Sequence, residues 1–193
     1  MIYLRNASLS DAGRILDIYR YYVEHTAVSF ECEAPSLEEF TARMQGIMET
    51  FPYIVICEDD RTEGYAYAKP FVGREGYRWS CETSIYLDRT AHRRGLGRRL
   101  YEALEEALRA MGVLNMYARI AYPEKEDEWL TTNSADFHAH LGFVKAGEYH
   151  KCAYKFGRWY NMICMEKEIG AHSGKPVFLP YRECGHSFLR PAQ

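Results

Sequence analysis

Patterns typical of disulfide-stabilised, metal-binding and membrane-spanning proteins are missing from this sequence. Its 193 residues include six cysteines but no Cys-x-x-Cys pair, so we expect reduced thiols that pack as small hydrophobic groups. No apolar stretch is long enough for a signal peptide or a membrane span. Near the C-terminus, His172, Cys184 and His186 match no zinc-ligand spacing. We therefore predict a cytoplasmic protein with no metal site and no membrane association.

An excess of basic charge is missing as well. The chain has 24 Lys and Arg residues against 27 Asp and Glu residues, a net charge of −3, which argues against nucleic acid as the partner. With 47% hydrophobic residues, the chain is long enough for one domain with a substantial core. The basic residues that cluster within residues 89–99 are therefore expected to serve a local anion.

That basic cluster contains a glycine-bearing segment, residues 92–97, which we call the glycine turn. It joins a strand-like run to an amphipathic helix, and the first N–H groups of a helix suit a phosphate oxygen because they have no partner within the helix. Two common phosphate motifs do not fit. The sequence has no Gly-Lys-Ser or Gly-Lys-Thr tripeptide, and the turn lacks the third glycine of a dinucleotide fingerprint. Two interpretations stay open, namely a pyrophosphate site of another kind and an ordinary loop with a solvated basic face.

Hydrophobic periodicity predicts a chain of mixed α/β class. The expected strands cover residues 2–5, 53–58, 65–69, 79–87, 114–121, 143–152 and 159–168. The expected helices begin near Ser8, Ser36, Leu96 and Ser134, the first two with capping boxes. We read residues 59–64 as a turn and 122–128 as a solvated loop. The composition shifts to Gly, Ser, Pro and His after residue 169, so we predict one domain over residues 1–169 and an extension over 170–193.

Several pieces of the sequence occur in a characteristic order around this turn. The turn reads His92-Arg93-Arg94-Gly95-Leu96-Gly97, and the other pieces cover residues 28–31, 64–68, 74–79, 81–87, 138–143 and 155–159. Together they resemble the GCN5-related N-acetyltransferase (GNAT) superfamily, whose signature is Gln/Arg-x-x-Gly-x-Gly/Ala. The phosphinothricin and methionine sulfone acetyltransferases are the most similar members, over residues 2–168. His92 in place of Gln or Arg, an insertion at residues 123–132 and the C-terminal extension depart from the family pattern.

This resemblance implies a fold and a cofactor. The GNAT fold has a mixed, mostly antiparallel sheet of about seven strands, flanked by about four helices and splayed between the fourth and fifth strands. Acetyl-CoA is the implied co-substrate. Backbone groups near Ile85, Tyr86 and Leu87 would bind its pantetheine and thioester, and Asn133 would bind pantetheine or cap its own helix. The pyrophosphate would be surrounded by Arg93, Arg94, Gly95, Leu96, Gly97 and Arg98.

Two side chains are implied to be catalytic. Amide formation from a thioester needs a base for the amine proton and a proton donor for the leaving thiolate. Glu82 matches the family's catalytic glutamate and would act through a water, whereas the alternative is an outward-facing strand carboxylate. His138 lies where many of these enzymes place a tyrosine acid, and an imidazole with a pKa of about 6.5 can do the same work. The alternative for His138 is a packing histidine.

The implied acceptor is the primary amine of a small molecule, an amino acid or an analogue such as phosphinothricin, methionine sulfone or methionine sulfoximine. Arg74 would bind the substrate carboxylate, and Phe30 and Glu31 would line the mouth of the amine pocket. Attack would be direct, without an acyl-enzyme, in a protein expected to form a homodimer. Two alternatives remain, a non-catalytic acyl-CoA-binding or sensor domain and an acetyltransferase for a polyamine, an antibiotic or a peptide N-terminus.

Overall fold

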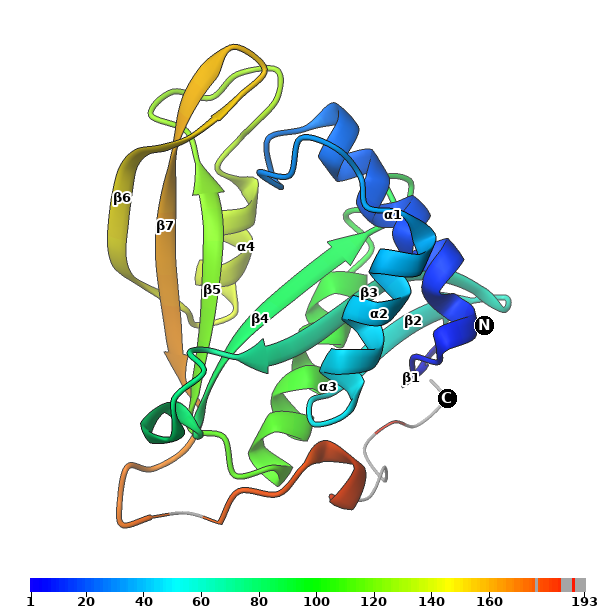
Figure 1. Ribbon diagram of the computed structural model, residues 1–193, viewed down its shortest axis with the longest axis vertical. Helices are drawn as coiled ribbons and strands as arrows, with labels where there is room; N and C mark the ends of the chain where they lie inside the picture. Colours follow the sequence, from blue (N-terminus) through cyan, green and yellow to red (C-terminus); the bar gives the residue numbers. More distant parts are fainter. Residues whose placement is uncertain (176, 185–188, 190–193) are drawn as a thin grey trace. The chain divides into compact units, whose positions relative to one another are not determined.

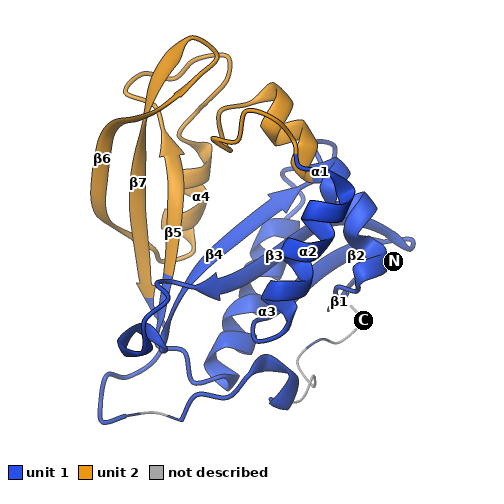
Figure 2. Ribbon diagram, viewed as in Figure 1, with its two compact units in different colours: residues 1–18, 35–116, 168–193 blue, residues 19–34, 117–167 orange. Residues whose placement is uncertain are grey.

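The computed structural model describes residues 1–175, 177–184 and 189, in two compact units. Unit 1 consists of residues 1–18, 35–116 and 168–193, and unit 2 of residues 19–34 and 117–167 (Figure 2). The described residues form seven strands and four α-helices, and no helix among them is long and apolar enough to cross a membrane. His186 lies outside the described residues, and within them no three His, Cys, Asp or Glu side chains could share a metal ion.

Unit 1 is built on an antiparallel four-stranded sheet with helices on both faces (Figure 1). Its strands, in spatial order, are β1 (Ile2–Asn6), β2 (Tyr53–Glu58), β3 (Arg61–Pro70) and β4 (Ser80–Leu87). Five successive residues of β2 are buried, which requires cover on both faces of the sheet. That cover comes from α2 (Leu37–Met48) and α3 (Leu96–Ala110), which lie on opposite faces in Figure 1.

The helix starts at Ser8 and Ser36 are confirmed. The Asp11 carboxylate accepts a hydrogen bond from the Ser8 backbone at 2.8 Å, and the capping box opens a 3-10 turn that continues as α1 (Ala12–His25). The Ser36 hydroxyl accepts a hydrogen bond from the Glu39 backbone at 3.1 Å at the start of α2. Both contacts link residues three apart, which is why the sequence alone could predict them.

The turn between β2 and β3 is shorter than predicted. The sequence suggested a turn over residues 59–64, but β3 already begins at Arg61. Only Asp59 and Asp60 form the turn, and both have positive φ, at 46° and 65°. Two residues in the left-handed region give a hairpin turn whose twist matches that of the strands, so the strands pair right up to it.

The described part of the C-terminal extension packs on unit 1. The Tyr181 backbone donates a hydrogen bond to the Thr50 carbonyl at 2.8 Å, and its hydroxyl donates one to the Asn6 side chain at 2.7 Å. A Cβ built on Gly112, the predicted helix stop with φ of 83°, would lie 2.1 Å from the Val177 carbonyl oxygen. Glycine at that position thus serves both the turn and the close approach of the extension. A domain boundary at residue 169 stays a prediction.

Unit 2 carries the remaining strands, β5 (Asn115–Tyr122), β7 (Arg158–Glu168) and β6 (Val144–Lys155), in that spatial order. Its helices are α4 (Asn133–His140) and residues 19–25 of α1, and the first two residues of β5 and the last residue of β7 belong to unit 1. The hairpin between β6 and β7 turns at Phe156 and Gly157, both with positive φ, which confirms the turn predicted around Gly157. β6 extends three residues beyond the predicted strand.

The segment predicted to be a solvated loop is partly ordered by its own carboxylate. The Asp127 side chain accepts hydrogen bonds from the backbones of Trp129 and Leu130 at 2.8 and 2.9 Å, and Leu130 is buried. The Trp129 carbonyl in turn accepts a hydrogen bond from the backbone of Ala27 at 2.9 Å. The solvated-loop prediction is therefore wrong for Asp127, because its carboxylate binds the backbone of Trp129, which in turn contacts the loop that follows α1.

Candidate functional site

The residues predicted for the site divide between the two units. Unit 1 contains Glu82, Arg74, the strand residues Ile85, Tyr86 and Leu87, and the whole glycine turn. Unit 2 contains Phe30, Glu31, Asn133 and His138. Each set is described within its own unit.

Glu82 is a buried carboxylate on β4. Only 7% of the residue is exposed, and its Oε1 lies 3.3 Å from the Nζ of Lys69, the residue directly opposite on β3. The next residue, Thr83, shares a hydrogen bond with the Tyr101 hydroxyl of α3, so Glu82 points to the other face of the sheet. A solvent-exposed strand carboxylate is thus excluded, and the role of Glu82 as a base stays a prediction.

Four tyrosine rings, which we call the tyrosine ladder, lie on the same sheet face as Glu82. They are Tyr53, Tyr65, Tyr67 and Tyr86, which come from β2, β3 and β4. The rings of Tyr53 and Tyr67 stack with centroids 4.9 Å apart, and those of Tyr65 and Tyr86 at 5.4 Å. The chain has 16 tyrosines, and their number alone does not show which of them lie together. The strand register places this ladder along the face that carries Glu82.

The glycine turn leads from the segment after β4 into α3. Gly95 precedes the helix with a φ of 74°, and a Cβ at this position would meet no heavy atom within 4 Å. Glycine is therefore required there by the left-handed backbone and not by crowding. The Arg99 amide is bonded to the Gly95 carbonyl at 3.2 Å, so the amides of Leu96, Gly97 and Arg98 precede the helical hydrogen-bond ladder. These amides are suited to an anion.

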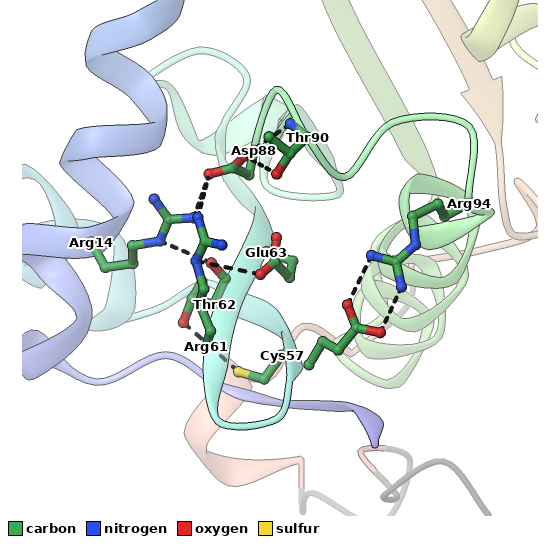
Figure 3. A network of polar contacts seen from close by, with 9 residues as sticks. Arg14, Cys57, Arg61, Thr62, Glu63, Asp88, Thr90 and Arg94 are labelled. Carbon is green, nitrogen blue, oxygen red and sulfur yellow. Dashed lines mark hydrogen bonds and ion pairs between the residues drawn. The ribbon is translucent and has the colours of Figure 1, made fainter.

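The arginines of the turn are not equivalent. Arg94 forms a two-pronged ion pair with Glu58 at the end of β2, with N–O distances of 2.8 and 2.6 Å (Figure 3). Arg98 lies 3.7 Å from Glu102 on α3, and Arg93 is exposed with a φ of 60°. A pyrophosphate would therefore compete with Glu58 for Arg94, whereas Arg93 stands at the surface of the turn.

Asp88, directly after β4, joins its own segment to α1 and β3 in unit 1 (Figure 3). Its carboxylate forms an ion pair with Arg14 of α1, lies 3.3 Å from Arg61, and accepts hydrogen bonds from the Thr90 backbone and hydroxyl at 2.9 and 2.6 Å. Arg14 also donates to the Thr62 carbonyl at 3.0 Å. Burial raises the pKa of Asp88, but the hydrogen bonds from Thr90 and the Arg14 charge outweigh it and hold the pKa below its usual range. The network fixes the backbone that leads into the glycine turn.

The comparison with known families decides what this arrangement belongs to. A family model described as an acetyltransferase (GNAT) domain matches residues 4–164. The chain belongs to the GNAT superfamily. It is an N-acetyltransferase, and the predicted GNAT fold, with its seven strands and four helices, is confirmed.

The curated relatives of this acetyltransferase include two enzyme types. The chain is 31% identical over 163 residues to the phosphinothricin N-acetyltransferase of Streptomyces coelicolor, which covers 82% of this chain and 91% of the relative. It is 27% identical over 171 residues to the L-methionine sulfoximine/L-methionine sulfone acetyltransferase of Salmonella typhimurium, covering 88% and 96%. Among solved structures, a GNAT superfamily phosphinothricin acetyltransferase from Sinorhizobium meliloti in complex with AcCoA is 31% identical. It has a TM-score of 0.84 and covers 91% of this chain and 93% of that one.

His138 of this acetyltransferase lies in apolar surroundings in unit 2. It is 4% exposed, and its ring meets those of Phe137 and Phe143 edge to face. Its Nδ1 donates to the Ser134 carbonyl at 2.7 Å, because a carbonyl oxygen can only accept. Burial lowers the pKa of His138, so the ring is neutral at pH 7 and its Nε2 carries a lone pair. Only the protonated minority form could donate a proton from Nε2, which favours the packing histidine over the acid as the interpretation to test.

The His138→Phe variant shows whether His138 donates a proton in the reaction or only packs against its neighbours. Since the neutral ring has no proton on Nε2, we expect this variant to keep kcat within about threefold of the wild-type value at pH 7.5. The measurement is the steady-state release of free coenzyme A. A loss of more than about tenfold, with an unchanged far-UV spectrum, would instead establish His138 as a proton donor.

The other predicted residues have separate surroundings. Asn133 is the exposed first residue of α4, and Thr132 occupies the cap position, so the capping role considered for Asn133 is wrong. Phe30 stacks on Tyr160 with centroids 6.3 Å apart. Glu31 is half-buried beside it, and Arg74 is exposed before the 3-10 turn at Glu75–Tyr77 in unit 1. The ligand-binding roles stay predictions for all four of these residues, Asn133, Phe30, Glu31 and Arg74.

A cavity of about 560 Å³ in unit 1 lies at the end of β4 away from the glycine turn, beside the 3-10 turn that follows Arg74. It is lined at one side by Trp79 and Ser80, where β4 begins, and at the other by His172 and Lys175 of the extension. The glycine turn follows the opposite end of β4. The His172 ring bonds Asn115 at 3.0 Å, so groups lining the cavity hold the extension in place.

Sequence reasoning missed several residues that support the site. Lys69 was not recognised because its pairing with Glu82 depends on the register between β3 and β4, which the sequence does not give. Asp88 had a usable signal, since Asp followed two residues later by Thr is typical of a turn in which the carboxylate binds the backbone. Asp127 had none, because a single charged residue in a loop is usually solvated.

Proposed function

We propose that this N-acetyltransferase transfers the acetyl group of acetyl-CoA to the primary amine of an amino acid or analogue such as phosphinothricin, methionine sulfone or methionine sulfoximine. The main observation behind the proposal is the path of the chain along β4 and into α3. One strand holds the buried Glu82 and then leads, through Asp88, into the glycine turn and the free amides of α3. A base and an anion site thus follow each other along one rigid element, as thioester chemistry needs. The relatives that act on such amines support the same acceptor class.

In the proposed reaction the amine nitrogen attacks the thioester carbonyl carbon, and a C–N bond forms as the carbonyl oxygen becomes an oxyanion. Glu82, through a water, takes one proton from the amine. Collapse of the tetrahedral intermediate breaks the C–S bond and expels coenzyme A as a thiolate, which takes up a proton. The ion pair with Lys69 holds the Glu82 carboxylate in one orientation for this step. The amides of Leu96, Gly97 and Arg98, with Arg93, would bind the pyrophosphate.

The coenzyme-release assay with a panel of amines tests the acceptor class. We expect turnover with phosphinothricin, methionine sulfone and methionine sulfoximine, and much less with spermidine, an aminoglycoside or a peptide N-terminus. A preference for one of the last three amines would overturn the assignment of an amino acid as the acceptor. If no amine of the panel is acetylated, the proposed function is overturned. Assembly as a homodimer stays a prediction, which sedimentation of the full chain would test.

Arg74 supplies a second test, because it is proposed to bind the substrate carboxylate. We expect Arg74→Ala to raise KM for methionine sulfone by roughly 10- to 100-fold, as loss of a charge-assisted hydrogen bond would. The matched control is methionine sulfone amide, which has the same amine and no carboxylate, and its KM should not change. If Arg74→Ala leaves KM for methionine sulfone unchanged, Arg74 does not bind the substrate carboxylate.

A further inference from the structure

Lys155, the last residue of β6, is a buried cation in unit 2. Only 4% of the residue is exposed. Its Nζ donates to the carbonyl of Val23 and to the carbonyl of Ser29, both at 2.7 Å, and lies 5.1 Å from the centre of the Phe156 ring. The ammonium thus joins two segments that are 132 and 126 residues away along the chain.

A buried ammonium persists only where its surroundings replace water. Val23 lies in the last turn of α1, where carbonyl groups have no partner within the helix and the helix dipole is negative. The Ser29 carbonyl is a second acceptor, and the Phe156 ring face adds a cation–π contact. Lys155 therefore links the end of α1 to the loop that follows it, with direct hydrogen bonds to both.

That loop, residues 26–31, is also held by neutral contacts, among them a 2.8 Å hydrogen bond between the hydroxyls of Tyr19 and Ser29. The Ala27 backbone donates to the Trp129 carbonyl at 2.9 Å, and the Phe30 ring stacks on Tyr160, whose hydroxyl donates to Asp127 at 3.0 Å. The Ser29 carbonyl is part of the peptide bond to Phe30. A shift of this carbonyl therefore displaces the backbone of Phe30 and of the next residue, Glu31.

We propose that Lys155 is a positioning residue of this acetyltransferase, which holds the loop of residues 26–31 so that Phe30 and Glu31 face the acceptor amine. It acts on the affinity for the amine and leaves the affinity for acetyl-CoA unchanged. This inference rests on the proposed function and on the prediction that these two residues line the mouth of the amine pocket.

The test compares Lys155→Met with Lys151→Met. Methionine matches the four-carbon stem of lysine but lacks the ammonium, so both carbonyls lose their donor. Lys151, on the same strand, is exposed and lies 3.8 Å from Glu124, so it controls for loss of a charge. We expect Lys155→Met to raise KM for methionine sulfone by about tenfold or more while KM for acetyl-CoA stays within about twofold. Amide hydrogen exchange at residues 27–31 should accelerate by about tenfold or more.

Lys155→Gln provides a second variant, because its shorter neutral side chain still has two N–H donors and should give intermediate values of both readouts. Unchanged exchange at residues 27–31, or equal rises in both KM values, would overturn the inference. If the wild-type enzyme acetylates no amine, the proposed function fails while the exchange comparison still decides whether Lys155 holds the loop. The Lys151→Met control should match the wild type in every measurement.

Discussion

Glu82→Gln is expected to lower kcat by roughly 10²- to 10⁴-fold at neutral pH, the usual contribution of a general base. Glutamine keeps the size and shape of the side chain but cannot take a proton from the amine. Glu82 lies on the sheet face opposite to α3, whose N-terminal amides are the proposed pyrophosphate site, so the Kd for acetyl-CoA should change by less than about twofold. Coenzyme release measures kcat, and calorimetry measures Kd.

Two further variants separate the chemistry of Glu82 from its orientation. Lys69→Met removes the cation 3.3 Å from the carboxylate and should give a smaller loss of kcat, because the base itself remains. Glu102→Gln removes an exposed carboxylate on α3 and should leave turnover unchanged. Full activity of Glu82→Gln would remove Glu82 from the mechanism and point to a base elsewhere in the chain.

Asp88→Asn is expected to lower the free energy of unfolding by about 3 kcal/mol, the typical cost of breaking a buried ion pair. The substitution leaves the Arg14 guanidinium without its counter-charge and weakens the hydrogen bonds from Thr90. Since the backbone after Asp88 leads into the glycine turn, acetyl-CoA should also bind about tenfold more weakly. Urea denaturation gives the first quantity and calorimetry the second.

The same variant has a pH dependence of known sign. The folded-state pKa of Asp88 is lowered below its usual value of about 3.8, so its contribution to stability is present above that value and is lost as the pH falls towards the folded-state pKa. The difference between wild type and Asp88→Asn should therefore be constant above about pH 5 and shrink below about pH 4. Asp60→Asn, in the exposed turn after β2, is the matched control and should cost less than about 1 kcal/mol. A difference that is as large at pH 2.5 as at pH 6 would contradict the role of the Asp88 charge.

Much of the fold follows from residues that are close in the sequence. The helix starts at Ser8 and Ser36, the stop at Gly112 and the hairpin turn at Gly157 all depend on contacts or dihedral angles within a few residues. The error in the first hairpin also has a local cause. The composition of residues 59–64 suggested a turn of six residues, whereas the backbone turns within Asp59 and Asp60. The order of the strands and the glycine turn was sufficient to predict the GNAT fold, since the family pattern links these pieces over most of the chain.

The charged side chains of the site required the tertiary structure. Arg94 looked like a pyrophosphate ligand in the sequence, but Glu58, 36 residues earlier, pairs with it. The chain offers 27 acidic and 24 basic residues, and exposed pairs among them differ little in free energy, so sequence gives no basis for choosing partners. The choice is made by strand register and packing, which bring together groups that are remote along the chain.

The sequence by itself determined the glycine turn, the strand that carries Glu82 and, through their order, the superfamily. Backbone dihedral angles and the period of apolar residues are local properties, so short stretches of sequence are enough to predict them. Only the tertiary structure decided that Glu82 is buried beside Lys69, that Asp88 binds Arg14 from 74 residues away, and that Lys155 is a buried cation. Burial and ion pairing depend on which segments pack together, and the paired segments can be as far apart in the sequence as the 132 residues between Val23 and Lys155.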